Sequence, residues 1–299
     1  MTKKTILLTG VSGVLGENIV TQILKNTDYN IIGLTGNITD MREKFNTKRV
    51  LLLDRDNWFN IIDKKSYIDT FINCGFPRTS DPTMLAKGLE DIEILINNVI
   101  KLNVKNIINI SSQSVYSQKK TEAATELTEV CPESLYGMTK YSVEKIIDLL
   151  CKQKDINYTH IRLGSLVSLD LKNRMTYKFM DQAFNNQPIY VNALNLNMSY
   201  LHVSDASNAI LNMLYKDNFN WKKIYNLGSA KSYLVKEIAS TVKDFLERKE
   251  NKHVEVVLAY NEDIFNNLVD STLFFNDFDW KPSFGLEDIL LEVYEALKP

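Results

Sequence analysis

Short apolar runs alternate with longer amphipathic segments through the first half of the chain. Three segments, at 14–24, 89–100 and 135–152, place apolar residues at helical spacing. Six runs of strand length are rich in Ile, Val, Leu or Phe: 5–9, 30–34, 50–53, 69–74, 106–110 and 158–163. Continuous apolar strands that alternate with helices are typical of a parallel sheet covered on both faces. The pattern therefore predicts an α/β fold.

The regular alternation stops after about residue 168. The rest of the chain has short apolar pieces at 189–191, 200–203, 224–227 and 254–258. Helical patterns are found near 206–215, 233–247 and 285–297. No linker of distinctive composition divides the chain. We expect a main domain over residues 1–168 and a smaller lobe over residues 169–299, interleaved with the last strands of the sheet.

Composition and charge exclude several classes of protein. The chain has 299 residues, 44% of them hydrophobic, and a formal net charge of −2. This near-neutral balance gives no reason to expect nucleic acid or an anionic membrane as a partner. The three cysteines and three histidines form no CxxC pair and no H-E-x-x-H motif, so no metal site is expected. No apolar segment approaches the ~20 residues of a membrane span, which predicts a soluble, cytoplasmic protein.

Three glycines lie between the first predicted strand and the first predicted helix. Gly10 permits a tight turn, Gly13 allows the backbone to approach a pyrophosphate, and Gly16 allows close packing of helix and strand. The N-terminus of the helix then offers free N–H groups to an anion. Three glycines alone are weak evidence, but their place between strand and helix is the one that dinucleotide binding requires.

A second motif places a phenol and an amine on one face of a predicted helix. Tyr136 and Lys140 are four residues apart, so the ammonium can lower the pKa of the phenol. Such a tyrosine can take a proton from a hydroxyl group or return it. This spacing is common by chance, but Ser112 ends the preceding predicted strand, 24 residues upstream (136 minus 112). The three residues together indicate carbonyl or alcohol chemistry.

The glycine turn and the Ser–Tyr–Lys set together resemble the short-chain dehydrogenase/reductase superfamily, in its extended branch, the NAD-dependent epimerase/dehydratase family. The resemblance implies a Rossmann-type doubly wound parallel sheet over 1–168 that binds NAD(P), with a smaller C-terminal substrate-binding lobe over 169–299. It also implies that Tyr136 is the general acid/base and that Ser112 polarises the carbonyl. Lys140 would lower the pKa of Tyr136 and hold the nicotinamide ribose.

The resemblance further implies a set of cofactor contacts. Asp54 would cap the adenine amino group, and Cys74 would pack at a crowded turn rather than act as a nucleophile. Thr35 stands where the family carries an acid that grips the adenosine ribose of NAD, which favours NADP(H) over NAD(H). The full set of expected cofactor-binding residues is Gly10, Gly13, Val14, Leu15, Gly16, Thr35, Asp54, Arg55, Cys74, Gly75, Tyr136, Lys140 and Ser165.

The residues after Ser112 narrow the reaction. Dehydratases of this family carry an Asp–Glu pair there, whereas this chain has Gln113 and Ser114, which cannot exchange protons as carboxylates do. Dehydration is therefore not expected. Together with Thr35, this favours an NAD(P)H-dependent reductase acting on a keto group of a sugar, with a nucleotide-linked 4-keto-deoxysugar as substrate. An NAD-dependent nucleotide-sugar epimerase is the alternative, and a non-catalytic dinucleotide-binding regulator is the third.

Two further expectations come from the resemblance. Many nucleotide-sugar members carry an Arg that binds the substrate diphosphate where this chain has Met198. Either Arg174 or Lys178 replaces it, or the substrate lacks a diphosphate. The apolar helices at 87–103 and 135–152 predict a homodimer through a four-helix bundle.

Overall fold

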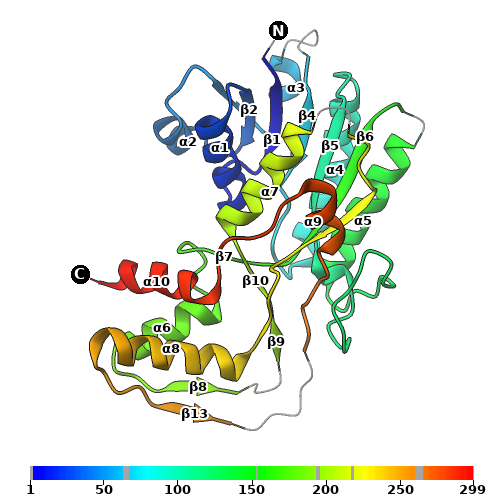
Figure 1. Ribbon diagram of the computed structural model, residues 1–299. Helices are drawn as coiled ribbons and strands as arrows, with labels where there is room; N and C mark the ends of the chain where they lie inside the picture. Colours follow the sequence, from blue (N-terminus) through cyan, green and yellow to red (C-terminus); the bar gives the residue numbers. More distant parts are fainter. Residues whose placement is uncertain are drawn as a thin grey trace.

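A seven-stranded parallel sheet forms the centre of the protein (Figure 1). The computed structural model describes residues 3–62, 67–152, 154–192, 196–216, 219–259 and 265–298. The strand order β3-β2-β1-β4-β5-β6-β11 confirms the predicted doubly wound α/β fold. The order reverses between β1 and β4, and ligands bind at the carboxyl ends of strands at such a point. The strands are β1 (Thr5–Thr9), β2 (Asn30–Thr35), β3 (Val50–Asp54), β4 (Thr70–Asn73), β5 (Asn106–Ser112), β6 (Asn157–Leu163) and β11 (Ile224–Leu227).

Helices cover both faces of this sheet. Successive side chains of each strand point to opposite faces, so both faces carry apolar residues that the helices bury. On β1, Ile6 and Leu8 pack in one core with the first group of helices, while Leu7 packs in another with the second group. The first group is α1 (Val14–Asn26), α2 (Ile38–Lys44), α7 (Val203–Tyr215) and α9 (Thr272–Phe278). The second is α3 (Trp58–Ile61), α4 (Pro82–Ile100) and α5 (Leu135–Cys151).

A smaller lobe has its own apolar core. Its helices are α6 (Met175–Phe184), α8 (Val235–Glu250) and α10 (Leu286–Leu297), and its parallel pair is β8 (Ile189–Val191) with β13 (Val256–Leu258). Two short pairs join the lobe to the rest: β7 (Ser165–Val167) with β10 (Tyr200–His202), and β9 (Asn197–Met198) with β12 (Tyr233–Leu234). The chain returns to the main sheet between these elements, because β11 pairs with β6. The division after residue 168 stays a prediction.

Several elements differ from the sequence expectation. Helix α4 begins at Pro82 rather than near residue 87, because the Asp81 carboxylate caps the N–H of Met84 at 2.8 Å and Pro82 suits the first turn. The sequence pattern did not predict α6 or α9. Helix α9 is held by tertiary packing, with Phe274 and Phe278 against the ring of Tyr225. No helix of the described ranges is long and apolar enough to cross a membrane.

Candidate active site

The predicted glycine turn brings the ends of β1 and β4 into backbone contact. Gly10 has a φ of +71°, and a Cβ there would lie 2.9 Å from the backbone nitrogen of Gly75. A Cβ on Gly16 would lie 2.1 Å from the carbonyl oxygen of Gly10. Gly13 is the N-cap residue of α1 and makes no side-chain capping bond, so N–H groups of the first helical turn stay available to an anion. These residues fit the pyrophosphate of a dinucleotide.

A cavity of about 490 Å³ extends from this turn over the ends of β2 and β3. Four of the predicted cofactor residues line it, and so do Ser12 and Phe76. The four are Gly10, Thr35, Arg55 and Gly75. Asp54 ends β3 without lining the cavity, and its carboxylate accepts the N–H of Asp56 at 2.9 Å. Gly13, Val14 and Gly16 form the turn and the start of α1 and line neither this cavity nor the next one.

The hydroxyl of Thr35 is fixed at the end of β2. It donates to the Ser12 hydroxyl over 3.3 Å and accepts the N–H of Asn37 at 3.0 Å. Thr35 is buried. Its hydroxyl is neutral, so this residue presents no charge to a ribose. Lys44, a cation nearby in the sequence, pairs with Glu17. At the end of β2 the chain therefore carries a neutral hydroxyl in place of a carboxylate.

A second cavity, of about 700 Å³, adjoins the first at Phe76, which lines both. It collects residues from the segment after β4, from β5, from α5 and from the segment after β6. All three predicted catalytic residues lie on its wall. The predicted residues that line it are Leu15, Cys74, Ser112, Tyr136, Lys140 and Ser165. The fold thus brings together residues that are up to 150 positions apart in the sequence (165 minus 15).

Local hydrogen bonds orient the Ser112 side chain. Ser112 is the last residue of β5, and its Oγ accepts the backbone N–H of Ser114 at 3.1 Å. A hydroxyl has one proton to donate in addition to its acceptor positions. With the acceptor side engaged by Ser114, the proton of Ser112 is available to an oxygen in the cavity.

Helix α5 is positioned by close contact with the turn after β5. Its cap is Ser134, whose hydroxyl accepts the N–H of Gly137 at 3.0 Å. A Cβ on Gly137 would lie 2.2 Å from the carbonyl oxygen of Ser114, so only glycine allows this approach. The contact carries the neighbouring Tyr136 to the same cavity as Ser112.

The electrostatic environment of Tyr136 and Lys140 follows from their burial. Burial raises the pKa of Tyr136, and the cation that opposes this rise is Arg78. The Lys140 ammonium donates to the Ile110 carbonyl, and burial lowers its pKa to about 8. Burial also raises the pKa of Cys74 to about 12, so this thiol is neutral at physiological pH, as its expected packing role requires. That Lys140 lowers the pKa of Tyr136 stays a prediction.

A buried ion pair lies behind the predicted catalytic residues. Glu144, one helical turn beyond Lys140, accepts from Arg162 at 2.8 and 3.1 Å and from the Ser111 hydroxyl at 2.5 Å. Arg162 also donates to the Tyr116 hydroxyl at 2.9 Å. Both charges are almost fully buried. This network ties α5 to the ends of β5 and β6, and the sequence offered a signal for it in the charged Arg162 within a strand of the central sheet.

Two arginines also line the second cavity, which is the candidate catalytic cavity. Arg78 follows β4, and Arg174, one of the two expected replacements for the missing arginine, is the N-cap residue of α6. The Nε of Arg174 is buried and has no hydrogen-bond partner within the described part of the chain. Burial lowers the pKa of Arg174, and the charge of Arg78 lowers it further. The two guanidinium groups therefore make one side of the cavity positive.

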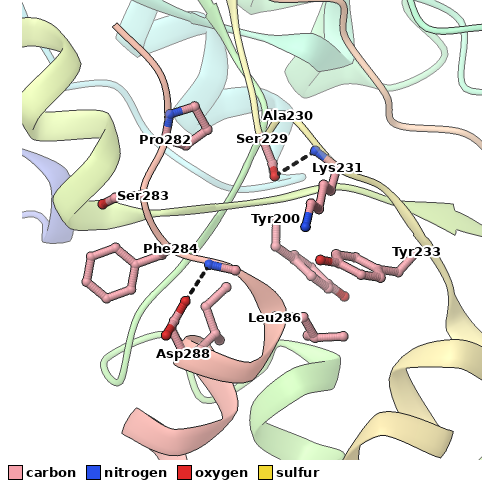
Figure 2. Close-up of a pocket in the computed structure, with 12 residues that line it drawn as sticks. Tyr200, Ser229, Ala230, Lys231, Tyr233, Pro282, Ser283, Phe284, Leu286 and Asp288 are labelled. Atoms are coloured by element: carbon pink, nitrogen blue, oxygen red, sulfur yellow. Dashed lines mark hydrogen bonds between the residues drawn. The ribbon is translucent and has the colours of Figure 1, made fainter.

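A third, smaller cavity of about 280 Å³ lies in the smaller lobe (Figure 2). Tyr200, Lys231 and Tyr233 line it together with the start of α10. Burial raises the pKa of Tyr200 to about 12, while the charge of Arg174 opposes the rise. None of the predicted site residues lines this third cavity.

His202 is held by structural contacts. Its Nδ1 caps the N–H of Ser204 at 3.3 Å, its Nε2 is 2.9 Å from Glu292, and its ring stacks on Phe284 at 4.0 Å. It lines none of the cavities described above. Among the described residues, no cluster of His, Cys, Asp and Glu could hold a metal ion.

A doubly wound sheet with a glycine turn at its switch point and a Ser–Tyr–Lys cavity beside it defines a dinucleotide-dependent enzyme class. Residues 6–228 match the model of the NAD dependent epimerase/dehydratase family. The chain belongs to this family, which confirms the resemblance found in its motifs.

Sequence alignments with two related proteins extend over most of the chain. A putative UDP-glucose 4-epimerase of Methanocaldococcus jannaschii is 27% identical over 256 residues, which are 80% of this chain and 81% of that protein. An uncharacterized UDP-glucose epimerase of Bacillus subtilis is 22% identical over 274 residues, which are 85% of this chain and 86% of that protein.

Solved structures share the fold at low sequence identity. The UDP-N-acetylglucosamine 4-epimerase from Bacillus cereus matches with a TM-score of 0.81 and 19% identity, over 99% of this chain and 96% of that one. A mutant UDP-glucuronic acid 4-epimerase from Bacillus cereus, in complex with a fluorinated nucleotide sugar and NAD, matches with a TM-score of 0.81 and 17% identity. That match covers 97% of this chain and 98% of the other.

Proposed function

We propose that the protein is an NAD-dependent epimerase of nucleotide sugars. The observation that carries this proposal is the single cavity on which Ser112, Tyr136 and Lys140 lie beside the glycine turn. Membership of the family and the epimerase names of its relatives favour this alternative over the ketoreductase that the sequence first indicated. A pure regulator would have no use for the Ser–Tyr–Lys set.

Each catalytic side chain has a distinct task in this proposal. A bound nicotinamide dinucleotide would supply reversible hydride transfer at one sugar carbon. Tyr136 takes the proton from the hydroxyl group on that carbon and later returns it. Ser112 donates its free proton to the same oxygen, because its own acceptor side is engaged by Ser114. Lys140 is expected to hold the nicotinamide ribose.

We infer that NAD is the resident cofactor. Several solved neighbours were obtained with NAD, and the comparisons give no support to the preference for NADP that Thr35 suggested. The polar partners of Thr35 within the chain already satisfy its hydroxyl. Dinucleotide released from the purified, denatured protein would be identified by mass spectrometry. Recovery of NADP instead of NAD would contradict this inference.

The positive side of the cavity supports a substrate with a diphosphate. This chain has Met198 where many family members carry an arginine that binds the substrate diphosphate. Arg174 is one of the two expected replacements for that arginine. Arg174 lines the cavity with a buried, unpartnered Nε, whereas Lys178, the other candidate, is exposed and does not line it. A guanidinium can hold phosphate oxygens through two parallel hydrogen bonds. We propose that Arg174 and Arg78 bind the substrate diphosphate.

The decisive experiment is incubation of the purified protein with UDP-glucose. Formation of the 4-epimer UDP-galactose, separated by chromatography, without accumulation of NADH would support the proposal. Tyr136→Phe should abolish the conversion and leave NAD binding nearly intact. The competing ketoreductase function, which Thr35 favours, would be indicated by oxidation of NADPH with a nucleotide 4-keto-6-deoxysugar and no epimerisation.

We also propose a homodimer that forms through α4 and α5. These helices lie together on one face of the sheet, and apolar side chains on them are exposed, including Ile94 at 60% and Leu149 at 73%. Pairing of the two helices with their copies would bury these side chains. Sedimentation equilibrium should give twice the chain mass, and a monomer at working concentration would contradict the proposal.

A further inference from the structure

Gln113 is buried at the carboxyl end of β5, yet one of its polar atoms has no partner among the residues that the structure describes. It begins the one-turn helix η1 (Gln113–Val115) and is 7% exposed. Its Nε2 makes only a long contact of 3.5 Å with the Ser114 hydroxyl. Its Oε1 is buried and accepts no hydrogen bond within the described residues. A buried carbonyl oxygen without a donor is unfavourable in a folded protein.

Gln113 lines the same cavity as Ser112 and Tyr136. Consecutive Cα atoms lie about 3.8 Å apart, so Gln113 reaches a bound sugar close to the oxygen that Ser112 contacts. Its amide is neutral and does not exchange protons at neutral pH. What it offers the substrate is an acceptor for a hydrogen bond.

We propose that Gln113 determines substrate specificity by accepting a hydrogen bond from a sugar hydroxyl group close to the reacting carbon, which for reaction at C4 is the 3- or the 6-hydroxyl. This inference rests on the proposed function and narrows its substrates to sugars with a donor at that position. A site built to bind a substrate hydroxyl discriminates strongly against an analogue without it, because the buried acceptor is then left unpaired. The unfavourable oxygen in the free protein becomes a favourable contact in the complex.

The melting temperature of a Gln113 variant distinguishes a role in substrate binding from a role in supporting the fold. Gln113→Met keeps an unbranched side chain of similar length and removes the unpartnered acceptor. If Gln113 supported the fold, the variant would melt at a lower temperature. The proposed role instead predicts an equal or higher melting temperature, because a buried polar atom without a partner is lost.

Binding of matched probes tests the specificity directly. Dissociation constants would be measured by calorimetry for UDP, UDP-glucose, UDP-3-deoxyglucose and UDP-6-deoxyglucose, in the Tyr136→Phe background so that no probe is converted. With Gln113 present, one of the two deoxy probes should bind about tenfold more weakly than UDP-glucose. In the Gln113→Met variant, the affinity for UDP-glucose should fall to the affinity for that deoxy probe, while the affinity for UDP should not change.

Two controls make the result specific. Gln113→Glu keeps an acceptor and should retain the discrimination. Gln187→Leu changes an exposed glutamine outside the cavities and should leave every dissociation constant unchanged. Equal binding of UDP-glucose with and without Gln113, or discrimination that persists in Gln113→Met, would overturn the inference. Failure of the Tyr136-intact protein to epimerise UDP-glucose, with the binding pattern as expected, would refute the proposed reaction and leave the role of Gln113 standing.

Discussion

The Oγ of Ser112 accepts the backbone N–H of Ser114 at 3.1 Å, which leaves the proton of Ser112 free to point into the catalytic cavity. Ser112→Ala removes this donor from the reacting oxygen. We expect kcat to fall roughly 100-fold, the order found when one donor to a developing charge is deleted. Steady-state kinetics with UDP-glucose would measure the loss. Ser112→Thr keeps the hydroxyl and should retain most of the activity, and equal losses in both variants would contradict a donor role.

Arg78 should tune the pH dependence through Tyr136. A nearby positive charge favours the phenolate, so Arg78 opposes the rise that burial causes in the pKa of Tyr136. Arg78→Ala therefore raises this pKa further, and a rate that needs the phenolate shifts to higher pH. Because Arg78 is exposed, water screens its charge, and kcat at neutral pH should fall only about 2- to 5-fold. The pH profile of kcat at saturating substrate would show this shift, Arg78→Lys should largely prevent it, and an unchanged profile would refute the coupling.

Gly137 should tolerate no side chain. A Cβ there would lie 2.2 Å from the backbone oxygen of Ser114, so Gly137→Ala must push α5 away from the turn after β5. We expect destabilisation by about 1–3 kcal/mol, together with a large loss of kcat because Tyr136 moves with the helix. Gly36→Ala is the matched control for stability, since a Cβ at Gly36 meets no atom within 4 Å. Denaturant unfolding of both variants would compare them, and similar midpoints would contradict the prediction.

Removal of either Glu144 or Arg162 should destabilise the protein. Both side chains are at most 2% exposed, and removal of either one leaves the other charge buried without compensation. Glu144→Gln should lower the free energy of unfolding by about 3–5 kcal/mol. The exposed pair of Arg248 and Glu287 is the control, and Glu287→Gln should cost about 0–1 kcal/mol. Equal effects at the two sites in denaturant titrations would show that burial does not govern the pair.

The main sheet could be predicted because its strands are buried on both faces and so appear as continuous apolar runs. The run at 5–9 coincides with β1, and the other runs differ from their strands by at most two residues at either end. Helix α9 could not be predicted, since it is seven residues long and depends on aromatic contacts with β11. Local patterns carry no information about such distant partners.

For the candidate site, too, local sequence patterns predicted some residues, while others depend on contacts that only the fold creates. Ser112, Tyr136 and Lys140 could be predicted to lie together because strand ends and helical spacing mark them in the sequence. Arg78 had no such mark, because it follows β4 in an irregular segment and reaches the cavity only through the fold. The unpaired oxygen of Gln113 was equally hidden, since hydrogen-bond satisfaction is a property of three-dimensional packing.

The return of the chain to the main sheet in β11 has a practical consequence for anyone who wishes to study the two halves separately. A fragment that stops at residue 168 would lack β11, and β6 would become a bare edge with unpaired backbone groups. It would also lack α7, which packs in one core with α1. Such an edge is a template for intermolecular strand pairing. A truncated fragment should therefore be recovered as insoluble material, and functional dissection of this protein is better done by point substitution than by cutting the gene.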